Sequence, residues 1–220
     1  MLSSMGKTPP YKKNLYRFPL ALIADLIDIK IHSNTMMKIE KACFPERMQE
    51  DLTHFYRFFK DKNALGLLLY WLNEPVGYVT ATHAYDDMTD NYFTTSADLR
   101  ETQKVTGYID SIAVLEEYRS IKNLDFLLHE LAVLMRDIDY RYLAAHVRKK
   151  NGFSRLMQRR YGAKVIKHYE NWSEFNEPFD FILIDLKYVK TLPSIYDYFF
   201  HVLRIFYRFL HRQFKKQKLQ

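Results

Sequence analysis

The order of apolar runs and turn signals between residues 105 and 163 constrains the fold more than any other part of the chain. An apolar run at Val105–Val114 predicts a strand, and a short turn leads from it into a helix that begins near Leu124. A second strand is predicted at Tyr142–Val147, followed by a short helix that runs into a turn at Gly162. Strands that alternate with helices in this way are typical of an α/β domain.

The sequence before this stretch predicts a strand, two helices, a hairpin and a long loop. Ile27–Ile31 alternates apolar with charged residues like a half-buried strand, and Ser33 or Asn34 can cap a helix that ends at Cys43, before Pro45. Residues 86–100 are polar and predict a loop. Further runs predict a helix over 52–59, a hairpin from 65–72 and 76–80, and two last strands at 163–169 and 179–186.

The positive charge of the chain is concentrated at its C-terminus. The net charge is +7, and residues 187–220 hold eight basic side chains against one acidic side chain, Asp197. The residues before them are balanced, so any attraction to an anionic partner should map to the tail. We therefore expect no nucleic acid partner for the domain.

The cysteine content and the apolar runs indicate where the protein works. Cys43 is the single cysteine, which excludes an internal disulfide and suits a reducing compartment, so we expect a cytoplasmic protein. The run Phe18–Ala24 contains Pro19 and is ended by Asp25, so it is interpreted as the entry to the domain and not as a signal peptide. No run approaches the ~20 apolar residues that a membrane-spanning helix needs.

Four local patterns resemble the GNAT superfamily of N-acetyltransferases. They are Gly77-Tyr78-Val79, Ile109 through Val114, Glu117-Tyr118-Arg119, and Asn151 through Gly162. The resemblance covers roughly residues 27–186 and implies a mixed, mostly antiparallel sheet that is splayed open between its fourth and fifth strands. It also implies a metal-free enzyme that transfers an acyl group from acetyl-CoA, or another acyl-CoA, to an unknown primary amine.

The resemblance places the acyl-CoA site first on a strand end and a loop. Backbone groups of Ile112, Ala113 and Val114 would hold the pantetheine arm, and the loop would cradle the pyrophosphate at a helix N-terminus. The loop residues are Arg119, Ser120, Ile121, Lys122, Asn123 and Leu124. The family has small residues where Lys122 and Leu124 stand, and a Cβ costs about 1–2 kcal/mol in a left-handed backbone. We expect an acyl-CoA affinity about tenfold below that of typical members; a helix start without a ligand is the alternative.

The helix after the fifth strand is the other implied part of this site. Asn151, Ser154 and Gln158 occupy positions at which the resemblance implies contact with the CoA arm. Where Gln158 stands the family often has a tyrosine that protonates the leaving thiolate, and an amide cannot replace that proton transfer. Tyr161 lies three residues further on, nearly one helical turn away, and is the candidate substitute.

Two residues are candidates for the general base. The ribosomal-protein N-acetyltransferase branch has a glutamate on the fifth strand where this chain has His146. A neutral imidazole with a pKa of about 6.5 can accept a proton from an ammonium group, whereas a strand histidine that holds a backbone carbonyl is the alternative. Asp110 on the fourth strand is the second candidate, as a base or as the group that orients His146 or the amine.

The chain divides into a flexible basic lead-in (1–17), the acyltransferase domain (18–186) and a basic amphipathic helix (187–220). After Pro193-Ser194, apolar residues recur at helical spacing with basic residues opposite. Such a helix can dock on its own domain, form a homodimer, or bind an anionic membrane as a peripheral protein. Two other functions stay open: a non-catalytic GNAT-fold protein that binds or regulates a partner, and an adaptor that works through residues 194–220.

Three further features have simple interpretations. Cys43 has no histidine at motif spacing and is expected to be a packed thiol, and the histidines show no metal-ligand spacing. The acidic residues Asp86, Asp87 and Asp90 could attract a cationic acceptor, and the basic residues 148–150 could meet a CoA phosphate. A solvated face is the alternative for both groups.

Overall fold

A computed structural model describes residues 22–150, 152–172 and 176–189 of the protein. These residues belong to one compact unit that ends at Val189. Arg136 holds the C-terminal end of this unit in place, because its guanidinium donates to the carbonyl oxygens of Leu186 and Val189. The expected lead-in (1–17), Asn151 and the expected C-terminal helix beyond Val189 lie outside the described residues.

A single mixed sheet organises the described residues. Its strand order is β1-β2-β3-β4-β5-β7-β6, and every neighbouring pair is antiparallel except β4 and β5, which are parallel. The strands are β1 (Leu22–Leu26), β2 (Leu65–Trp71), β3 (Glu74–His83), β4 (Thr106–Val114), β5 (Tyr142–Arg148), β6 (Lys164–Tyr169) and β7 (Phe179–Asp185). The predicted mixed, mostly antiparallel sheet is therefore confirmed.

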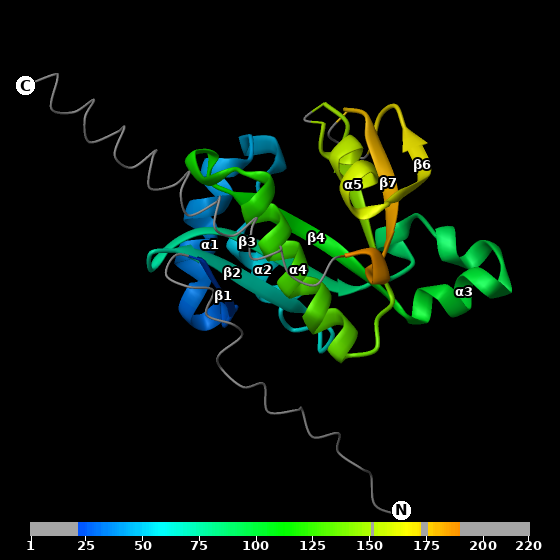
Figure 1. The fold of residues 1–220 in the computed structure, drawn as a ribbon, viewed down its shortest axis with the longest axis horizontal. Helices are drawn as coiled ribbons and strands as arrows, with labels where there is room; N and C mark the ends of the chain where they lie inside the picture. Colours follow the sequence, from blue (N-terminus) through cyan, green and yellow to red (C-terminus); the bar gives the residue numbers. More distant parts are fainter. Residues whose placement is uncertain (1–21, 151, 173–175, 190–220) are drawn as a thin grey trace, which may run out of the picture. The chain divides into compact units, whose positions relative to one another are not determined.

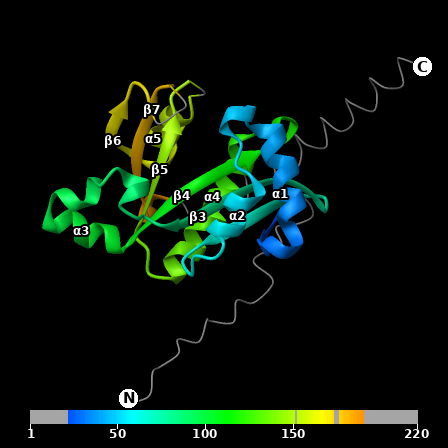
Figure 2. The ribbon, with the colours of Figure 1, turned by 180° about the vertical axis from the view of Figure 1, so that it is seen from behind.

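Helices cover both faces of this sheet. In Figure 1 α4 crosses one face, and Figure 2, seen from behind, shows α1 and α2 on the other. The apolar side chains divide in the same way, because Leu67, Val79 and Ile109 pack under α4 whereas Leu68 and Tyr78 pack under α1 and α2. The helices are α1 (Ile29–Cys43), α2 (Leu52–Phe58), α3 (Ala97–Lys104), α4 (Ile121–Asp137) and α5 (Phe153–Tyr161).

The sheet is splayed between β4 and β5, as the resemblance implied. The two strands pair only from Thr106 to Tyr108 on β4 and from Tyr142 to Ala144 on β5, although both continue beyond these residues. Figure 1 shows β5, β7 and β6 diverging from the β1–β4 half. The opening therefore widens toward Val114 and Arg148.

A β-bulge at Asp110 changes the side-chain alternation of β4. Ala81 pairs with Ile109 and Thr80 pairs with Ser111, so Asp110 is the extra residue. Tyr108 lies on the α1/α2 face and Ile109 packs under α4, and the bulge then directs both Asp110 and Ser111 to the α1/α2 face. Two consecutive polar side chains consequently face the same side at the edge of the opening.

Three predicted element boundaries are wrong. The first strand is β1, and the expected strand at 27–31 is instead the start of α1, because the Asp28 side chain caps the helix by accepting from Lys30 N–H. Helix α4 begins at Ile121 and not near Leu124, because Ser120 caps it. The expected loop at 86–100 runs into α3, which Ser96 caps.

Candidate active site

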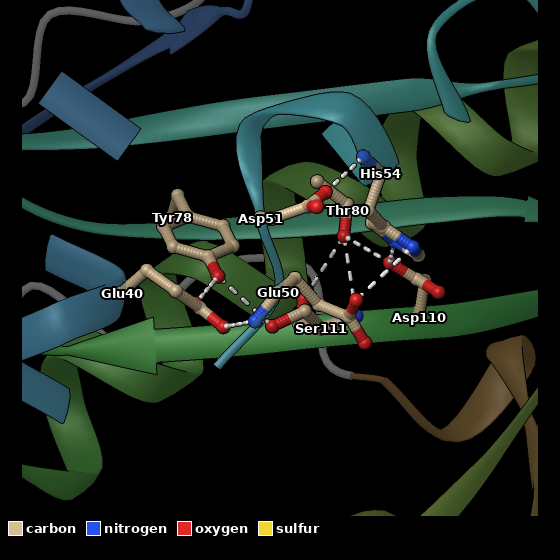
Figure 3. A network of polar contacts seen from close by, with 8 residues as sticks. All are labelled: Glu40, Glu50, Asp51, His54, Tyr78, Thr80, Asp110 and Ser111. Atoms are coloured by element: carbon tan, nitrogen blue, oxygen red, sulfur yellow. Dashed lines mark hydrogen bonds and ion pairs between the residues drawn. The ribbon is translucent and has the colours of Figure 1, made fainter. Parts of the chain in front are cut away.

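A polar network lies between α1, α2 and the sheet on the face to which Asp110 and Ser111 point (Figure 3). Its residues come from α1, the α1–α2 connection, α2, β3 and β4, and they are Glu40, Glu50, Asp51, His54, Tyr78, Thr80, Asp110 and Ser111. Thr80 contacts both bulge residues, because its hydroxyl lies 3.2 Å from Asp110 Oδ2 and accepts from Ser111 N–H at 3.1 Å. The bulge is thus held by the side chain opposite it.

His54 lies between two carboxylates. Its Nε2 is 3.3 Å from Asp110 Oδ2, and its Nδ1 is 3.2 Å from Glu50 Oε2. The hydrogen bond to Asp110 is the main reason that the pKa of His54 is raised, although burial acts against it. Side-chain exposure increases from Asp110 (15%) through His54 (20%) to Glu50 (44%), so the three groups are arranged in order from the sheet to solvent.

Glu40 is the buried end of the network. Its carboxylate accepts from the Tyr78 hydroxyl and, at 2.8 Å, from Glu50 N–H, and Tyr78 Oη also lies 3.0 Å from Ser111 Oγ. Burial raises the pKa of the Glu40 carboxyl and that of the Tyr78 phenol. These contacts tie α1 and the α1–α2 connection to the bulge, so they hold His54 over Asp110.

The sequence prediction missed Glu40, His54 and Tyr78. Glu40 stands at helical spacing from Met36 and Cys43, so it is a charged residue on an otherwise apolar stripe. A buried carboxylate at such a position needs hydrogen-bond partners, and this was the available signal. His54 gives no such signal, because its neighbourhood depends on where α2 crosses the sheet.

His146 lies on the same face but in aromatic surroundings. Its ring is stacked between Trp172 at 4.4 Å and Phe181 at 4.7 Å, and Nδ1 is 3.0 Å from the Tyr108 hydroxyl. Nε2 is buried and, within the described residues, has no hydrogen-bond partner. Burial lowers the pKa of His146 to about 4, so the ring is neutral at physiological pH and is a weak base.

Asp110 and His146 are not brought together, and the possibility that Asp110 orients His146 is not supported. The Asp110 carboxylate contacts His54 and Thr80, whereas His146 contacts the Tyr108 hydroxyl. His146 therefore remains a prediction as a base, and the hydrogen-bonded pair of His54 and Asp110 is a second arrangement with this chemistry.

Tyr161 is bound to α4 and not free at the opening. Its hydroxyl donates to Asp125, which also accepts from Arg160, and the ring packs in the core under α4 and α5. Burial and the Asp125 carboxylate raise the pKa of Tyr161 far above its usual value. The phenol is a poorer proton donor in this setting.

The predicted phosphate loop is largely helical. Ser120 accepts from Asn123 N–H at 3.1 Å, the Asn123 amide donates to Tyr118 C=O at 2.7 Å, and Arg119 Nε donates to Val114 C=O at 2.8 Å. Leu124 packs against the core, whereas Ile121 is exposed and Lys122 is partly buried on the first turn of α4. The glycines of the family are thus replaced by a capped helix start.

The backbone of β4 fits an amide-containing arm better than this loop fits a pyrophosphate. Leu115 N–H bonds to Val76 C=O, and antiparallel bonding alternates along a strand. Ala113 therefore faces β3, while the backbone groups of Ile112 and Val114 face the opening. An acyl-CoA arm could bond there, and the Val114 carbonyl would have to be shared with Arg119.

Ser154 and Gln158 have other partners in this structure. The Ser154 hydroxyl donates to the buried Asp180, Gln158 Nε2 donates to Ser154 Oγ at 3.1 Å, and His168 Nδ1 lies 2.8 Å from Asp180 Oδ1. This arrangement joins α5 to β6 and β7. The contacts predicted for these two residues with the CoA arm remain predictions, as does that of Asn151, which lies outside the described residues.

The other residues singled out in the sequence have the following surroundings. Cys43 is half-buried and packs beside the α1/α2 core, and burial raises the pKa of its thiol. Asp86 and Asp90 contact Gln103 and Lys167 respectively. The residues that the structure describes contain no cluster of three metal-ligating side chains, and none of their helices is long and apolar enough to cross a membrane.

The splayed sheet resembles several solved structures. The ribosomal-protein-S18-alanine N-acetyltransferase of Escherichia coli is 11% identical, with a TM-score of 0.58 over 79% of this chain and 97% of that chain. NAA60 of Arabidopsis thaliana, solved with acetyl-CoA, is 16% identical, with a TM-score of 0.59 over 74% and 96%. YncA of Salmonella typhimurium, a putative acetyltransferase solved with acetyl-CoA, is 14% identical, with a TM-score of 0.56 over 76% and 94%. At these identities the likeness shows the fold alone.

The fold and the site define an N-acetyltransferase-like α/β enzyme. The sequence model of the acetyltransferase (GNAT) family matches residues 33–163, which is more than half of the chain. The chain therefore belongs to the GNAT acetyltransferase family. None of the curated protein sequences compared with it matches.

Proposed function

We propose that the protein transfers an acyl group, in the first instance acetyl, from acyl-CoA to a primary amine, with Asp110 and His54 as the groups that remove the amine proton. The observation that carries this assignment is the contact between His54 and Asp110 at the bulge, beside the opening between β4 and β5. The three acetyltransferase structures described above share the splayed fold, and two of them hold acetyl-CoA.

The amine would lie against Asp110 and attack the thioester carbonyl directly. A C–N bond forms, the C–S bond breaks, and the sulfur leaves as a thiolate. The proton released by the nitrogen passes through Asp110 and His54 toward Glu50, which is the most exposed of the three. We assign no protein group as the acid for the thiolate, because Gln158 cannot donate a proton and Tyr161 is bound to Asp125.

The pair at the bulge is a better base than His146. A protonated amine with a pKa of about 10 must lose its proton, and the free-energy cost of the transfer falls as the pKa of the base rises toward that of the amine. The pKa of His54 is raised above its ordinary value, whereas that of His146 is lowered to about 4. Each pKa unit corresponds to about 1.4 kcal/mol, so the difference favours His54.

The test is acetyl transfer by the full-length protein from acetyl-CoA to a panel of primary amines, followed as thiol release and by mass of the product. We expect Asp110→Asn and His54→Ala each to lower kcat/KM by about 10²–10⁴, the usual scale for a general base. Asp137→Asn and His32→Ala, on exposed or partly exposed helical sites away from the network, are matched controls with wild-type rates.

Two results would contradict this assignment. If His146→Ala loses activity while His54→Ala retains it, the base is His146. If the wild-type protein transfers no acetyl group to any amine of a broad panel, the non-catalytic function gains support. One observation favours that alternative: the Ser120 hydroxyl already accepts from Asn123 N–H at the helix start where a phosphate would bind.

A further inference from the structure

Glu177 links the two halves of the splayed sheet. It precedes β7 and accepts from Arg148, the last residue of β5, through Nε at 2.9 Å and through a second guanidinium nitrogen. It also accepts from Arg47, which lies in a single 3-10 turn (Glu46–Met48) between α1 and α2. Since α1 and α2 pack over β3 and β4, the contact between Arg47 and Glu177 crosses the opening between β4 and β5.

This ion-pair group lies on the same face as the candidate bases. Arg148 is two residues after His146 on β5, so both side chains point to the same side of the sheet. Arg47 is three residues before Glu50, which contacts His54. Under the proposed function, an amine would reach Asp110 through the wide end of the opening, between the α1–α2 connection and Glu177 before β7, and we call this end the entrance.

The charges at this entrance differ from those further inside. Two guanidinium groups share one carboxylate, so this group of three side chains has a net positive charge, whereas the inner part holds the two carboxylates Asp110 and Glu50 around His54. Within the described residues, Arg47 donates only to Glu177, although a guanidinium has five N–H donors. Its side chain is 57% exposed, so the remaining donors are accessible to a ligand.

We propose that Arg47 and Arg148 form an anion subsite for the acceptor, and that the acceptor is an amine that also carries a carboxylate. This inference rests on the proposed function. The ammonium group of the acceptor binds Asp110, and the carboxylate of the acceptor binds Arg47. Arg47 then either contacts both this carboxylate and Glu177 or releases Glu177. Planar guanidinium groups suit carboxylates because they can bind both oxygens at once. Glu177 then sets the selectivity, because it competes with the acceptor for the same donors.

The experiment compares acceptors that differ by one charge: the peptide Ala-Glu-Gly amide with Ala-Gln-Gly amide, and β-alanine with β-alanine amide. We expect the full-length protein to prefer the acidic member of at least one pair by about tenfold in kcat/KM, the scale of one charge-assisted hydrogen bond. Arg47→Gln should abolish this preference by raising KM for the acidic acceptor, and Arg100→Gln on the exposed face of α3 is the matched control.

The variant Glu177→Gln distinguishes a role of Glu177 in selecting the acceptor from a purely structural role. If Glu177 competes with the acceptor, its replacement lowers KM for the acidic acceptor and leaves the neutral acceptor unchanged, which is the opposite of Arg47→Gln. If the three residues only brace the two halves, both variants lower activity alike for all acceptors, and the inference is wrong. Thermal unfolding shows whether each variant is folded. If Glu177→Gln is not folded, the result with Arg47→Gln still decides between the selective role and the structural role.

A binding measurement keeps this test separate from the proposed function. Calorimetry of the two peptides with the full-length protein needs no turnover. Tighter binding of Ala-Glu-Gly amide that is lost in Arg47→Gln supports the anion subsite even if no acetyl transfer occurs. In that case the proposed function is wrong, but the inference about the anion subsite still holds. The β-alanine pair is measured in the same way, and equal binding within both pairs overturns the inference whatever the activity.

Discussion

At the scale of single residues, the site depends on a histidine whose two ring nitrogens both face carboxylates. Asp110 and Glu50 favour the charged form of His54, and the nearby Arg57 opposes it. The aromatic rings around His146 have the reverse effect, because burial disfavours its charged form. Two histidines on one face of one sheet therefore have pKa values shifted in opposite directions by their neighbours.

The opposite shifts lead to a pH test. Only the unprotonated form of His54 accepts a proton, and its pKa is raised, so kcat/KM should rise with pH through a midpoint above about 6.5. Glu50→Gln removes one of the charges that raise this pKa and should move the midpoint to lower pH with the same acceptor. The measurement is a pH profile of both proteins with one amine, whose own titration is common to both.

A base with a pKa of about 4 gives a different profile. If His146 were the base, it would already be unprotonated at pH 6, and Glu50→Gln would leave the profile unchanged. An unshifted midpoint would therefore contradict the role of His54.

At the scale of elements, the sequence predicts the features that depend on local periodicity. The apolar runs of β4 and β5, the hairpin of β2 and β3 and the turn after α5 at Gly162 all appear where expected. A strand was predicted at the start of α1 because Ile27, Ile29 and Ile31 alternate with polar residues. These residues are helical from Ile29 onward because the Asp28 side chain caps the helix. The bulge at Asp110 has no signature of its own, because it depends on the register with β3.

The candidate site, like the fold, was predictable from the sequence only where local patterns reveal it. Asp110 was a candidate from the sequence, where a polar residue within an apolar strand is visible, and its role stays a prediction. His54 and Glu40 come to Asp110 from helices 56 and more residues away, through packing that no local pattern encodes. The residues of the predicted phosphate loop can be read from the sequence, but the cap by Ser120 was not predicted, and the effect on acyl-CoA affinity stays a prediction.

The contact between α4 and α5 makes a prediction about Tyr161. Its hydroxyl is bound to Asp125, so Tyr161→Phe should lower the free energy of unfolding by about 1 kcal/mol, the worth of one hydrogen bond, and change the transfer rate by less than about twofold. Chemical denaturation and acetyl transfer measure the two effects, with Tyr188→Phe on the surface as the control. A fall in rate of about a hundredfold would identify Tyr161 as the acid after all.

At the scale of the whole molecule, polar links join the two halves of the sheet on both faces. On one face Asp125 of α4 binds Arg160 and Tyr161 of α5, and on the other Glu177 binds Arg47 and Arg148. Direct pairing between β4 and β5 covers only the narrow end of the opening. These side chains therefore contribute to holding the halves at the distance that the site requires.

The charge distribution makes a prediction about residues 194–220. Removing them should leave a folded protein, because the described unit closes at Val189 through Arg136, and should remove most of the net charge of +7. We expect this truncated protein to lose homodimerisation or binding to anionic vesicles. Sedimentation and vesicle flotation distinguish the two, because high salt weakens only the second. An insoluble or unfolded product would show that the segment is required by the fold.

The opening between β4 and β5 also bears on aggregation. Unpaired strand edges are places where other chains add to a sheet, and the outer edges here carry exposed charges, Asp25 on β1 and Lys164 and Lys167 on β6. The edges of β4 and β5 that face the opening are protected in another way, because the two strands converge at Tyr108 and Ala144. An added strand keeps a constant spacing of about 4.8 Å from each neighbour, so it cannot pair along two diverging edges. A strand of another protein can therefore pair with at most one of these two edges, whereas a slender ligand can contact the backbone groups of either edge.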